Sequence, residues 1–410
     1  MTPSQTHISG IADVDAITAQ ILGRKTSYFS EDLVRFREDL RTRIEGRRIC
    51  VIGAGGSIGS AFVEQVAHYS PGCLHLIDLS ENALAEMVRM LRSAGTTLPK
   101  DFRSIPLDFH SNEFKALLNS LKSPYDYVLN FAALKHVRSE KDQFSLMRLL
   151  MTNVVGNYDL LNHSAAERMF AVSSDKAVNP ANLMGASKAF MERVFLAHQS
   201  DSYNFGSARF ANVAFSDGSL LDGFLKRIRK KQPLSAPTDV KRYFISRTEA
   251  GELCLLSCFI GNHKEIFVPR MKPEDFLYSF TDIAATVLQG FGFEVELCES
   301  DAEAIQKASD ITASSTHWPC YFSPADTSGE KGYEEFSGGH EKVDVGRFEK
   351  IDVVTAPQET EKLIVEEAVE QIRDLHQKGE WTKRDLIAIV KQVVPELNHL
   401  ETHQNLDQKM

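Results

Sequence analysis

The chain has 410 residues, of which 43% are hydrophobic and 25% are charged, and its formal net charge is −10. This length and composition predict one large α/β unit with additions, or two domains. The negative charge argues against nucleic acid as the main partner, no apolar run is long enough to span a membrane, and no signal peptide follows Met1, so we expect a cytoplasmic protein.

A glycine-rich turn follows the first predicted strand. Residues 48–52 predict a buried strand, and apolar residues return at helical spacing from residue 58. Glycines in such a turn let backbone N–H groups and the helix N-terminus approach a pyrophosphate. We therefore predict dinucleotide contacts from Gly53, Gly56, Ser57, Ile58 and Gly59. A tight turn without a ligand is the alternative.

Asp78 ends the next predicted strand, about twenty residues beyond the last glycine, where an acidic group binds the ribose hydroxyls of a dinucleotide. A carboxylate there repels a 2′-phosphate, so we predict NAD rather than NADP as the cofactor. The alternative for Asp78 is a cap for the helix that follows.

Strand and helix patterns alternate along the rest of the first 270 residues. Helical spacing is present around 87–91, and further strands are predicted at 104–107, 127–133 with its loop, 169–172, 207–213 and 265–269. This alternation predicts an α/β fold, a Rossmann-like doubly wound parallel sheet with helices on both faces, with ligands bound beyond the carboxyl ends of its strands.

Two other local patterns have simple explanations. The basic stretch 226–231 contains no aromatic residue, which favours a solvated helix face over a nucleic-acid site. Cys254 and Cys258 are one helical turn apart in an apolar segment, which is typical of a helix face rather than of a metal or redox site. The sequence predicts no metal centre.

The string at 173–180, Ser-Ser-Asp-Lys-Ala-Val-Asn-Pro, carries most of the predicted chemistry. It places a hydroxyl, an acid and a base at a strand end, in Ser174, Asp175 and Lys176, and Lys188 follows on the next predicted helix. The position at which a Tyr-x-x-x-Lys enzyme has its tyrosine holds Met184. The alternative for Asp175 and Lys176 is an ion pair that only closes the strand.

These motifs occur in a characteristic order, together with Phe131-Ala-Ala-Leu-Lys-His-Val137, Thr152-Asn-Val-Val-Gly-Asn157, Arg209-Phe-Ala-Asn-Val213 and Gly329-Glu-Lys-Gly-Tyr-Glu-Glu335. From about residue 20 to 345 the chain resembles extended short-chain dehydrogenase/reductases of bacterial polysaccharide biosynthesis, specifically the nucleotide-sugar 4,6-dehydratases acting on nucleotide-linked N-acetylglucosamine. The resemblance implies tightly bound NAD, with additional cofactor contacts from Asp108, Phe131, Ala132, Ala133, Asn153 and Lys188.

The implied reaction moves a hydride from C4 of the hexose to NAD, eliminates water across C5 and C6, and returns the hydride to C6. Lys176 as a neutral amine can remove the C5 proton, and protonated Asp175 can donate to the C6 oxygen. A thioether exchanges no proton, so Met184 cannot replace the tyrosine as the C4 base. The chain resembles a subset with methionine at this position, for which we expect Ser174, backed by Asp175 or Lys188, to take the C4 proton, and retention at C5.

The resemblance also implies substrate contacts, namely from Lys135, Met184, Asn212, Arg242, Glu330, Lys331 and Glu335. Arg242 would neutralise the pyrophosphate. For each of these residues that is charged, the alternative is a surface charge that does not contact the substrate. Asp217 departs from the pattern because relatives place a basic residue there, and the sequence leaves a uridine or a guanosine nucleotide open.

The predicted organisation is an N-terminal helical arm at 1–45, an NAD-binding domain at 46–300 with a substrate-region insert at about 214–244, a substrate-binding region at 301–350 and a helical tail at 351–410. Two amphipathic helices, within 363–375 and 386–394, are expected to pack on the core or on another subunit, and the residues from His399 to be disordered. We expect a homo-oligomer. An epimerase or reductase of a nucleotide sugar, and a catalytically silent NAD-binding protein, are the alternative functions.

Overall fold

A computed structural model of the protein describes residues 13–198, 204–325, 333–357 and 359–398. Within these ranges the largest sheet has nine strands in the order β14-β15-β10-β6-β5-β4-β1-β2-β3. Its strands are β1 Arg48–Ile52, β2 Cys73–Asp78, β3 Asp101–Pro106, β4 Tyr127–Asn130, β5 Arg168–Ser174, β6 Asn204–Phe210, β10 Glu265–Pro269, β14 Lys342–Asp344 and β15 Ile351–Ala356.

All pairings from β3 across to β10 are parallel, which confirms the predicted doubly wound α/β fold. The sheet is mixed at one edge, where β15 pairs antiparallel with both β10 and β14. Between β10 and β15 the chain passes through the smaller unit described below and returns to this edge in the opposite direction.

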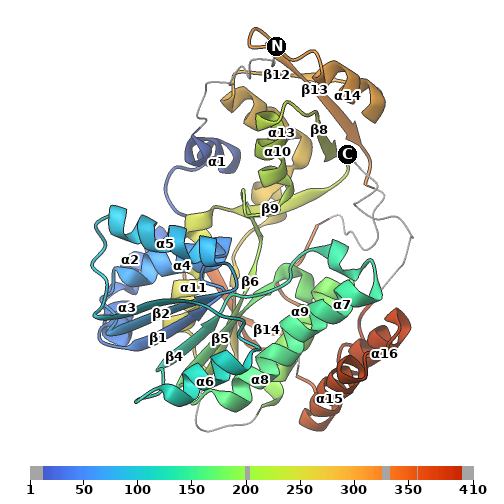
Figure 1. The fold of residues 1–410 in the computed structure, drawn as a ribbon. Coiled ribbons are helices and arrows are strands. Elements are labelled where there is room, and N and C mark those ends of the chain that lie inside the picture. The colour runs from blue at the N-terminus through green and yellow to red at the C-terminus, as the bar shows by residue number, and fades with distance from the viewer. Residues whose placement is uncertain (1–12, 199–203, 326–332, 358, 399–410) are drawn as a thin grey trace, which may run out of the picture.

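Helices cover both faces of the large sheet (Figure 1). Alternate residues of β1 point to opposite faces, Cys50 and Ile52 into one apolar cluster and Ile49 and Val51 into the other. The first face is covered by α6 Asn112–Ser120, α7 Gln143–Leu150, α8 Gly156–His163 and α9 Leu183–Ala197, and the second by α2 Ser30–Arg35, α3 Arg37–Ile44, α4 Ser57–Ala67, α5 Glu81–Ser93 and α11 Arg247–Ile260. Cys254 and Cys258 are both buried on α11, as predicted.

A smaller unit lies above the carboxyl ends of the large sheet in Figure 1. It has its own apolar cluster, which contains the fully buried Trp318. Its elements are α1 Val14–Leu22, α10 Leu220–Arg229, α12 Pro273–Phe276, α13 Phe280–Gly290, α14 Asp301–Ala308, β7 Asn212–Val213, β8 Leu234–Pro237, β9 Lys241–Ile245, β11 Leu277–Ser279, β12 Glu294–Leu297 and β13 His317–Ser323. The basic stretch 226–231 includes the end of α10, where Lys226 and Lys230 are exposed.

The predicted strand at 207–213 was wrong in its extent. β6 ends at Phe210, and the chain then leaves the large sheet to form β7, which pairs with β9 of the smaller unit. The stretch that looks like one strand in the sequence therefore forms two strands in different sheets, and the chain passes from the large unit to the small one between them.

The C-terminal segment begins with strand β15 rather than a helix, and its helices follow at α15 Lys362–Lys378 and α16 Lys383–Val393. The two helices form a hairpin beside α8 and α9 in Figure 1. Their buried residues, including Ile372 and Val390, join the apolar cluster of α7 to α9. Of the two predicted alternatives, the structure has the tail packed on the core of its own chain. The residues predicted to be disordered, from His399, lie outside the described residues.

Within the described ranges, no helix has the length and apolar character needed to cross a membrane.

Candidate active site

The glycine turn after β1 is closely packed against the loop after β4. Gly53 has φ +74°, and a Cβ at this position would lie 2.4 Å from the backbone nitrogen of Ala132. A Cβ on Gly59 would lie 2.1 Å from the Gly53 carbonyl oxygen. Both positions therefore require glycine, and the turn is brought against the predicted cofactor segment Phe131–Ala133.

The start of α4 leaves backbone donors at the surface of this turn. Gly56 is the N-cap residue and is exposed, and no side chain caps the helix. Ser57 and Ile58 are half-buried in its first turn. The N–H groups and the helix dipole at this end suit a pyrophosphate. The Ser57 hydroxyl accepts a hydrogen bond from the backbone nitrogen of Asp217 at 2.9 Å, so a loop of the smaller unit reaches the same place.

Asp78 holds the glycine turn from the neighbouring strand. Its Oδ2 accepts from the Gly55 nitrogen at 2.8 Å, and its Oδ1 accepts from the Ser80 nitrogen at 2.8 Å. The cap of α5 is Ser80, which accepts from the Ala83 nitrogen. Asp78 therefore lies at the turn, as a ribose-binding acid would, and the capping role belongs to Ser80.

Asp108 follows β3 and accepts a hydrogen bond from the His110 nitrogen at 3.0 Å. Its carboxylate also lies 3.9 Å from the Arg148 guanidinium on α7. The residue is half-buried, so its predicted cofactor contact stays a prediction that the local geometry permits.

Asn153 lies in a π-helical turn, Met151–Val155, and is fully buried. Its side-chain amide donates to the Leu134 carbonyl and to the Ser187 hydroxyl, each at 2.9 Å, and its Oδ1 accepts from the Leu134 nitrogen at 3.0 Å. Both amide hydrogens are thus used inside the protein. Asn153 joins the loop after β4 to α9, and its predicted cofactor contact stays a prediction.

Ser174, Asp175 and Lys176 form one hydrogen-bonded cluster at the end of β5. Asp175 Oδ1 accepts from the Ser174 hydroxyl at 2.8 Å and from the Lys176 side-chain nitrogen, Nζ, at 3.2 Å. The Asp175 side chain is buried, and its Oδ2 has no hydrogen-bond partner among the described residues. A buried carboxyl oxygen without a partner is costly, and it is expected where a ligand completes the site.

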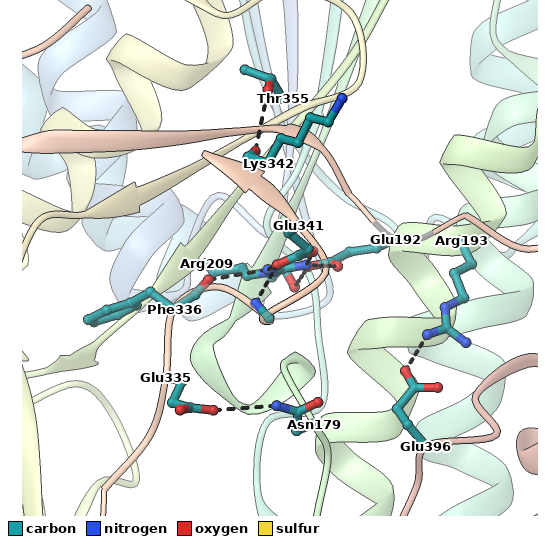
Figure 2. Close-up of polar contacts among 12 residues, drawn as sticks. Asn179, Glu192, Arg193, Arg209, Glu335, Phe336, Glu341, Lys342, Thr355 and Glu396 are labelled. Atoms are coloured by element: carbon teal, nitrogen blue, oxygen red, sulfur yellow. Dashed lines mark hydrogen bonds and ion pairs between the residues drawn. The ribbon is translucent and has the colours of Figure 1, made fainter. Parts of the chain in front are cut away.

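Glu334 is a site residue that the sequence prediction missed. It is 3% exposed, and its Oε1 lies 4.0 Å from the Lys176 Nζ, so that Lys176 lies between two carboxylates. The prediction chose Glu335 from the same string. Glu335 is exposed and accepts a hydrogen bond from the Asn179 amide at 3.4 Å (Figure 2). Glu330 and Lys331 lie outside the described residues.

Lys188 lies on α9 behind the end of β5. Its Nζ donates to the Val172 carbonyl at 2.8 Å, and burial lowers the pKa of Lys188 to about 8, although the charge of Glu192 acts in the opposite direction. An amine with this pKa exchanges its proton readily near neutral pH.

Met184 is only 3% exposed and belongs to the same apolar cluster as Ala177 and Leu183. Its carbonyl oxygen accepts from the Ser187 hydroxyl at 2.7 Å. The thioether therefore contributes to the packing at the start of α9, and a contact with substrate stays a prediction.

The remaining predicted substrate residues border the smaller unit. Lys135 is exposed and lies 3.5 Å from the Ser216 hydroxyl. Asn212 donates to the Tyr243 carbonyl at 3.2 Å, and Arg242 is buried on the same strand as Tyr243. Burial raises the pKa of Tyr243, and the nearby Tyr333, Glu274 and Asp175 act in the same direction, in that order.

A buried ion triad fixes the back of the site. Arg209 on β6 bonds Glu192 of α9 at 2.8 Å and Glu341 at 2.7 Å (Figure 2). Glu192 also accepts from the Ser173 hydroxyl at 2.5 Å. Burial favours the neutral acid, yet the Arg209 guanidinium lowers the pKa of Glu341. The triad connects the end of β5 with the segment that carries Glu334, and sequence reasoning missed it because its members are far apart in the chain.

A second polar cluster lies at the opposite, amino end of the strands. His75 of β2 is hydrogen-bonded through Nδ1 to the Tyr125 hydroxyl at 2.7 Å and through Nε2 to Asp101 at 3.0 Å. Potential ligand atoms of Cys73, His75 and Asp101 all lie within 4.8 Å of one another. The guanidinium groups of Arg48 and Arg103 each lie 3.3 Å from Asp101, so this carboxylate is already neutralised. The geometry fits a hydrogen-bonded network rather than a cation site.

Comparison with known proteins identifies the relatives of this chain. A model of the family described as "Polysaccharide biosynthesis protein" matches residues 49–355. The chain is 29% identical over 292 residues to the probable polysaccharide biosynthesis protein EpsC of Bacillus subtilis, covering 70% of this chain and 46% of that protein. It is 28% identical over 237 residues to a UDP-N-acetylglucosamine 4,6-dehydratase (inverting) of Campylobacter jejuni, covering 55% of this chain and 67% of that protein.

Solved structures show the same fold. The structure of Pen from Bacillus thuringiensis gives a TM-score of 0.61 at 19% identity and covers 81% of this chain and 98% of its own. A double mutant of DesIV, a dTDP-glucose 4,6-dehydratase from Streptomyces venezuelae with NAD and DAU bound, gives 0.54 at 17% identity, covering 71% of this chain and 88% of its own. The family match runs from β1 into β15 and so includes the whole large sheet and the polar cluster at its carboxyl end. The chain therefore belongs to this polysaccharide biosynthesis family of extended short-chain dehydrogenase/reductases.

Proposed function

We propose that the protein is an NAD-dependent 4,6-dehydratase that acts on a nucleotide-linked N-acetylhexosamine, with UDP-N-acetylglucosamine as the first substrate to test. The observation that carries this proposal is the geometry of Asp175, whose Oδ1 holds a hydroxyl and an amine while its buried Oδ2 has no partner in the described residues. A carboxyl group that is hydrogen-bonded to a hydroxyl and to an amine supplies the acid and the base that elimination of water next to a carbonyl group requires.

The residues around the glycine turn fit a dinucleotide. The turn at Gly53 has no space for a side chain, the first turn of α4 presents uncapped N–H groups, and Asp78 lies beside Gly55. When bound, NAD would accept a hydride from C4 of the sugar and return it to C6. Lys188 would hold the nicotinamide ribose, and Asn153 would hold the loop after β4 against α9.

The protein groups then move three protons. The Ser174 hydroxyl takes the proton of the C4 hydroxyl and passes its own to Asp175, to which it is already hydrogen-bonded. Lys176, as the free amine, removes the C5 proton that the C4 ketone has acidified. Asp175 donates its proton to the C6 oxygen, which leaves as water, and Lys176, whose amine hydrogens exchange with solvent, delivers a proton to C5. Asp175 thus acts first as a base and then as an acid, and the pair ends the cycle as it began.

Incubation with UDP- and GDP-N-acetylglucosamine, followed by mass spectrometry, tests the proposal. The expected product has lost one water and contains a ketone, without added reductant. A product of unchanged mass would instead indicate an epimerase, and bound NAD with no product from either substrate would support a silent binding protein. We predict retention at C5, and the coupling constants of the product distinguish it from the inversion named for the Campylobacter relative.

A further inference from the structure

The loop between the catalytic cluster and α9 has a strained conformation. It spans residues 177–182, and within it Asn179 has φ +45°, a left-handed conformation that a non-glycine residue adopts at a cost in free energy. The surrounding structure must therefore hold the loop in place. Its end is fixed by Glu140, whose carboxylate accepts from the Leu183 nitrogen at 2.5 Å.

Asn398, the last described residue of the C-terminal segment, contacts the middle of the same loop. Its backbone nitrogen donates to the Pro180 carbonyl oxygen at 3.1 Å. Pro180 is the last residue of the Ser-Ser-Asp-Lys-Ala-Val-Asn-Pro string, and it follows the strained Asn179 directly. Glu335 accepts a hydrogen bond from the Asn179 side chain. The loop is therefore held by two hydrogen bonds from distant segments, one to Glu335 and one to Asn398.

The tail also anchors α9, the helix that carries Lys188. Arg193 is 3% exposed, and its guanidinium donates to the Val393 carbonyl. It also donates to the Glu396 carboxylate, as Figure 2 shows. Every residue of α9 is buried, because the sheet covers one side and the hairpin covers another. Residues 362–398 lie beyond the family match, which ends at residue 355.

We propose that the C-terminal hairpin, residues 362–398, is a positioning element of the active site. It fixes the loop 177–182 through Asn398 and fixes α9 through Arg193 and Glu396, and thereby sets the orientation of Asp175 and Lys176. In this proposal the hairpin takes no part in the proton transfers, and its contribution is to hold Asp175 and Lys176 in the orientation that those transfers require. Turnover measurements of this role rest on the proposed function, whereas the exchange measurement below does not.

Asn398→Pro in the full-length chain removes the N–H donor to Pro180, and Asn398→Ala is the matched control because it keeps that donor. Hydrogen–deuterium exchange followed by mass spectrometry should show faster exchange in peptides covering 177–185 for the proline variant alone. With UDP-N-acetylglucosamine, kcat should fall about three- to tenfold, as expected for one lost hydrogen bond, while NAD affinity stays unchanged because the glycine turn is remote from the tail.

Glu396→Ala, with Glu396→Gln as its control, tests the second anchor in the same way, and it removes no backbone donor. Equal exchange in the two Asn398 variants and equal exchange in the two Glu396 variants would overturn the proposal. Faster exchange throughout α15 and α16 in Asn398→Pro would mean that the hairpin had detached. In that case the comparison of exchange at 177–185 between Glu396→Ala and Glu396→Gln decides whether the proposal stands. A wild-type protein without turnover, but with the expected exchange difference, would refute the dehydratase assignment and leave the hairpin's role intact.

Discussion

The two ends of the large sheet each carry a polar cluster with a buried titratable side chain at its centre, Asp175 at one end and His75 at the other. At the carboxyl end, Asp175 binds a hydroxyl and an amine and keeps one buried oxygen without a described partner. At the amino end, His75 has both ring nitrogens hydrogen-bonded, to Tyr125 and to Asp101. Burial alone therefore does not distinguish a reactive group from a structural one. The difference lies in the central group of each cluster, because both ring nitrogens of His75 have partners, whereas Oδ2 of Asp175 has none among the described residues.

The largest expected effect comes from Lys176 and Asp175. Lys176→Met should abolish incorporation of solvent deuterium at C5, and Asp175→Asn should slow elimination by ~10²–10⁴-fold, as for a lost general acid. Product analysis in heavy water measures both, with the melting temperature as the control for folding. Wild-type turnover that leaves C5 unlabelled would contradict the assignment of the base.

Replacing Asp78 should weaken cofactor binding and leave the groups that transfer protons intact. Asp78→Ala leaves the Gly55 nitrogen without its acceptor and removes the predicted ribose contact, so NAD binding should weaken by about 1–3 kcal/mol. Titration calorimetry provides the measurement. Tighter binding of NADP than of NAD by the wild-type protein would refute the predicted role of this carboxylate.

His75→Phe should lower the stability of the protein and leave its catalysis unchanged. It leaves Tyr125 and Asp101 without their shared partner, so the free energy of unfolding should decrease by about 1–3 kcal/mol. The kcat should be unchanged, because the cluster lies at the far end of the strands. Denaturant unfolding and steady-state kinetics on the same preparation test this contrast, and a large loss of kcat at unchanged stability would remove the distinction between the two clusters.

The pH dependence of stability refines the same comparison. Burial lowers the pKa of His75 below its ordinary value of 6.5, although the hydrogen bond to Asp101 acts in the opposite direction. As pH falls below 6.5, the unfolded chain binds a proton at His75 before the folded chain does, so the free energy of unfolding should decrease and then level off below the folded pKa. The variant His75→Phe should show a smaller decrease over this range, and identical slopes would show that His75 is not responsible.

Met184→Leu should have the smallest effect. The side chain is buried in an apolar cluster, and leucine nearly conserves its volume, so the stability cost should be below about 1.5 kcal/mol. Turnover should persist because a thioether transfers no proton. Loss of turnover as complete as that of Lys176→Met would assign Met184 a direct role in the reaction.

The sequence predicted features that depend on local pattern. The glycine turn, Asp78 at the end of β2 and the cluster after β5 are each encoded within a few residues, and the structure brings them to the same edge of the sheet. Glu334 could not be distinguished from Glu335, because adjacent carboxylates differ only in the direction that the folded segment gives them.

Contacts between distant segments were beyond sequence reasoning. Arg209 and Glu341 are more than a hundred residues apart, and Asn398 is still farther from Pro180. The contacts of Asn153 were missed for a related reason, since its amide donates to Leu134 and Ser187, which only the folded chain brings together.

The hairpin of α15 and α16 also bears on self-association. Each chain covers α7 to α9 with its own helices, and Val369, Ile372 and Val390 bury their apolar surface in doing so. A second copy that approached this side could not bury the apolar surface of α7 to α9 that the hairpin already covers. The apolar side chains left for contact on this side include Leu363 of α15 and Phe144 of α7, which are both exposed. Substitutions at these two positions would test this surface as the interface of the predicted homo-oligomer without altering the helix that carries Lys188.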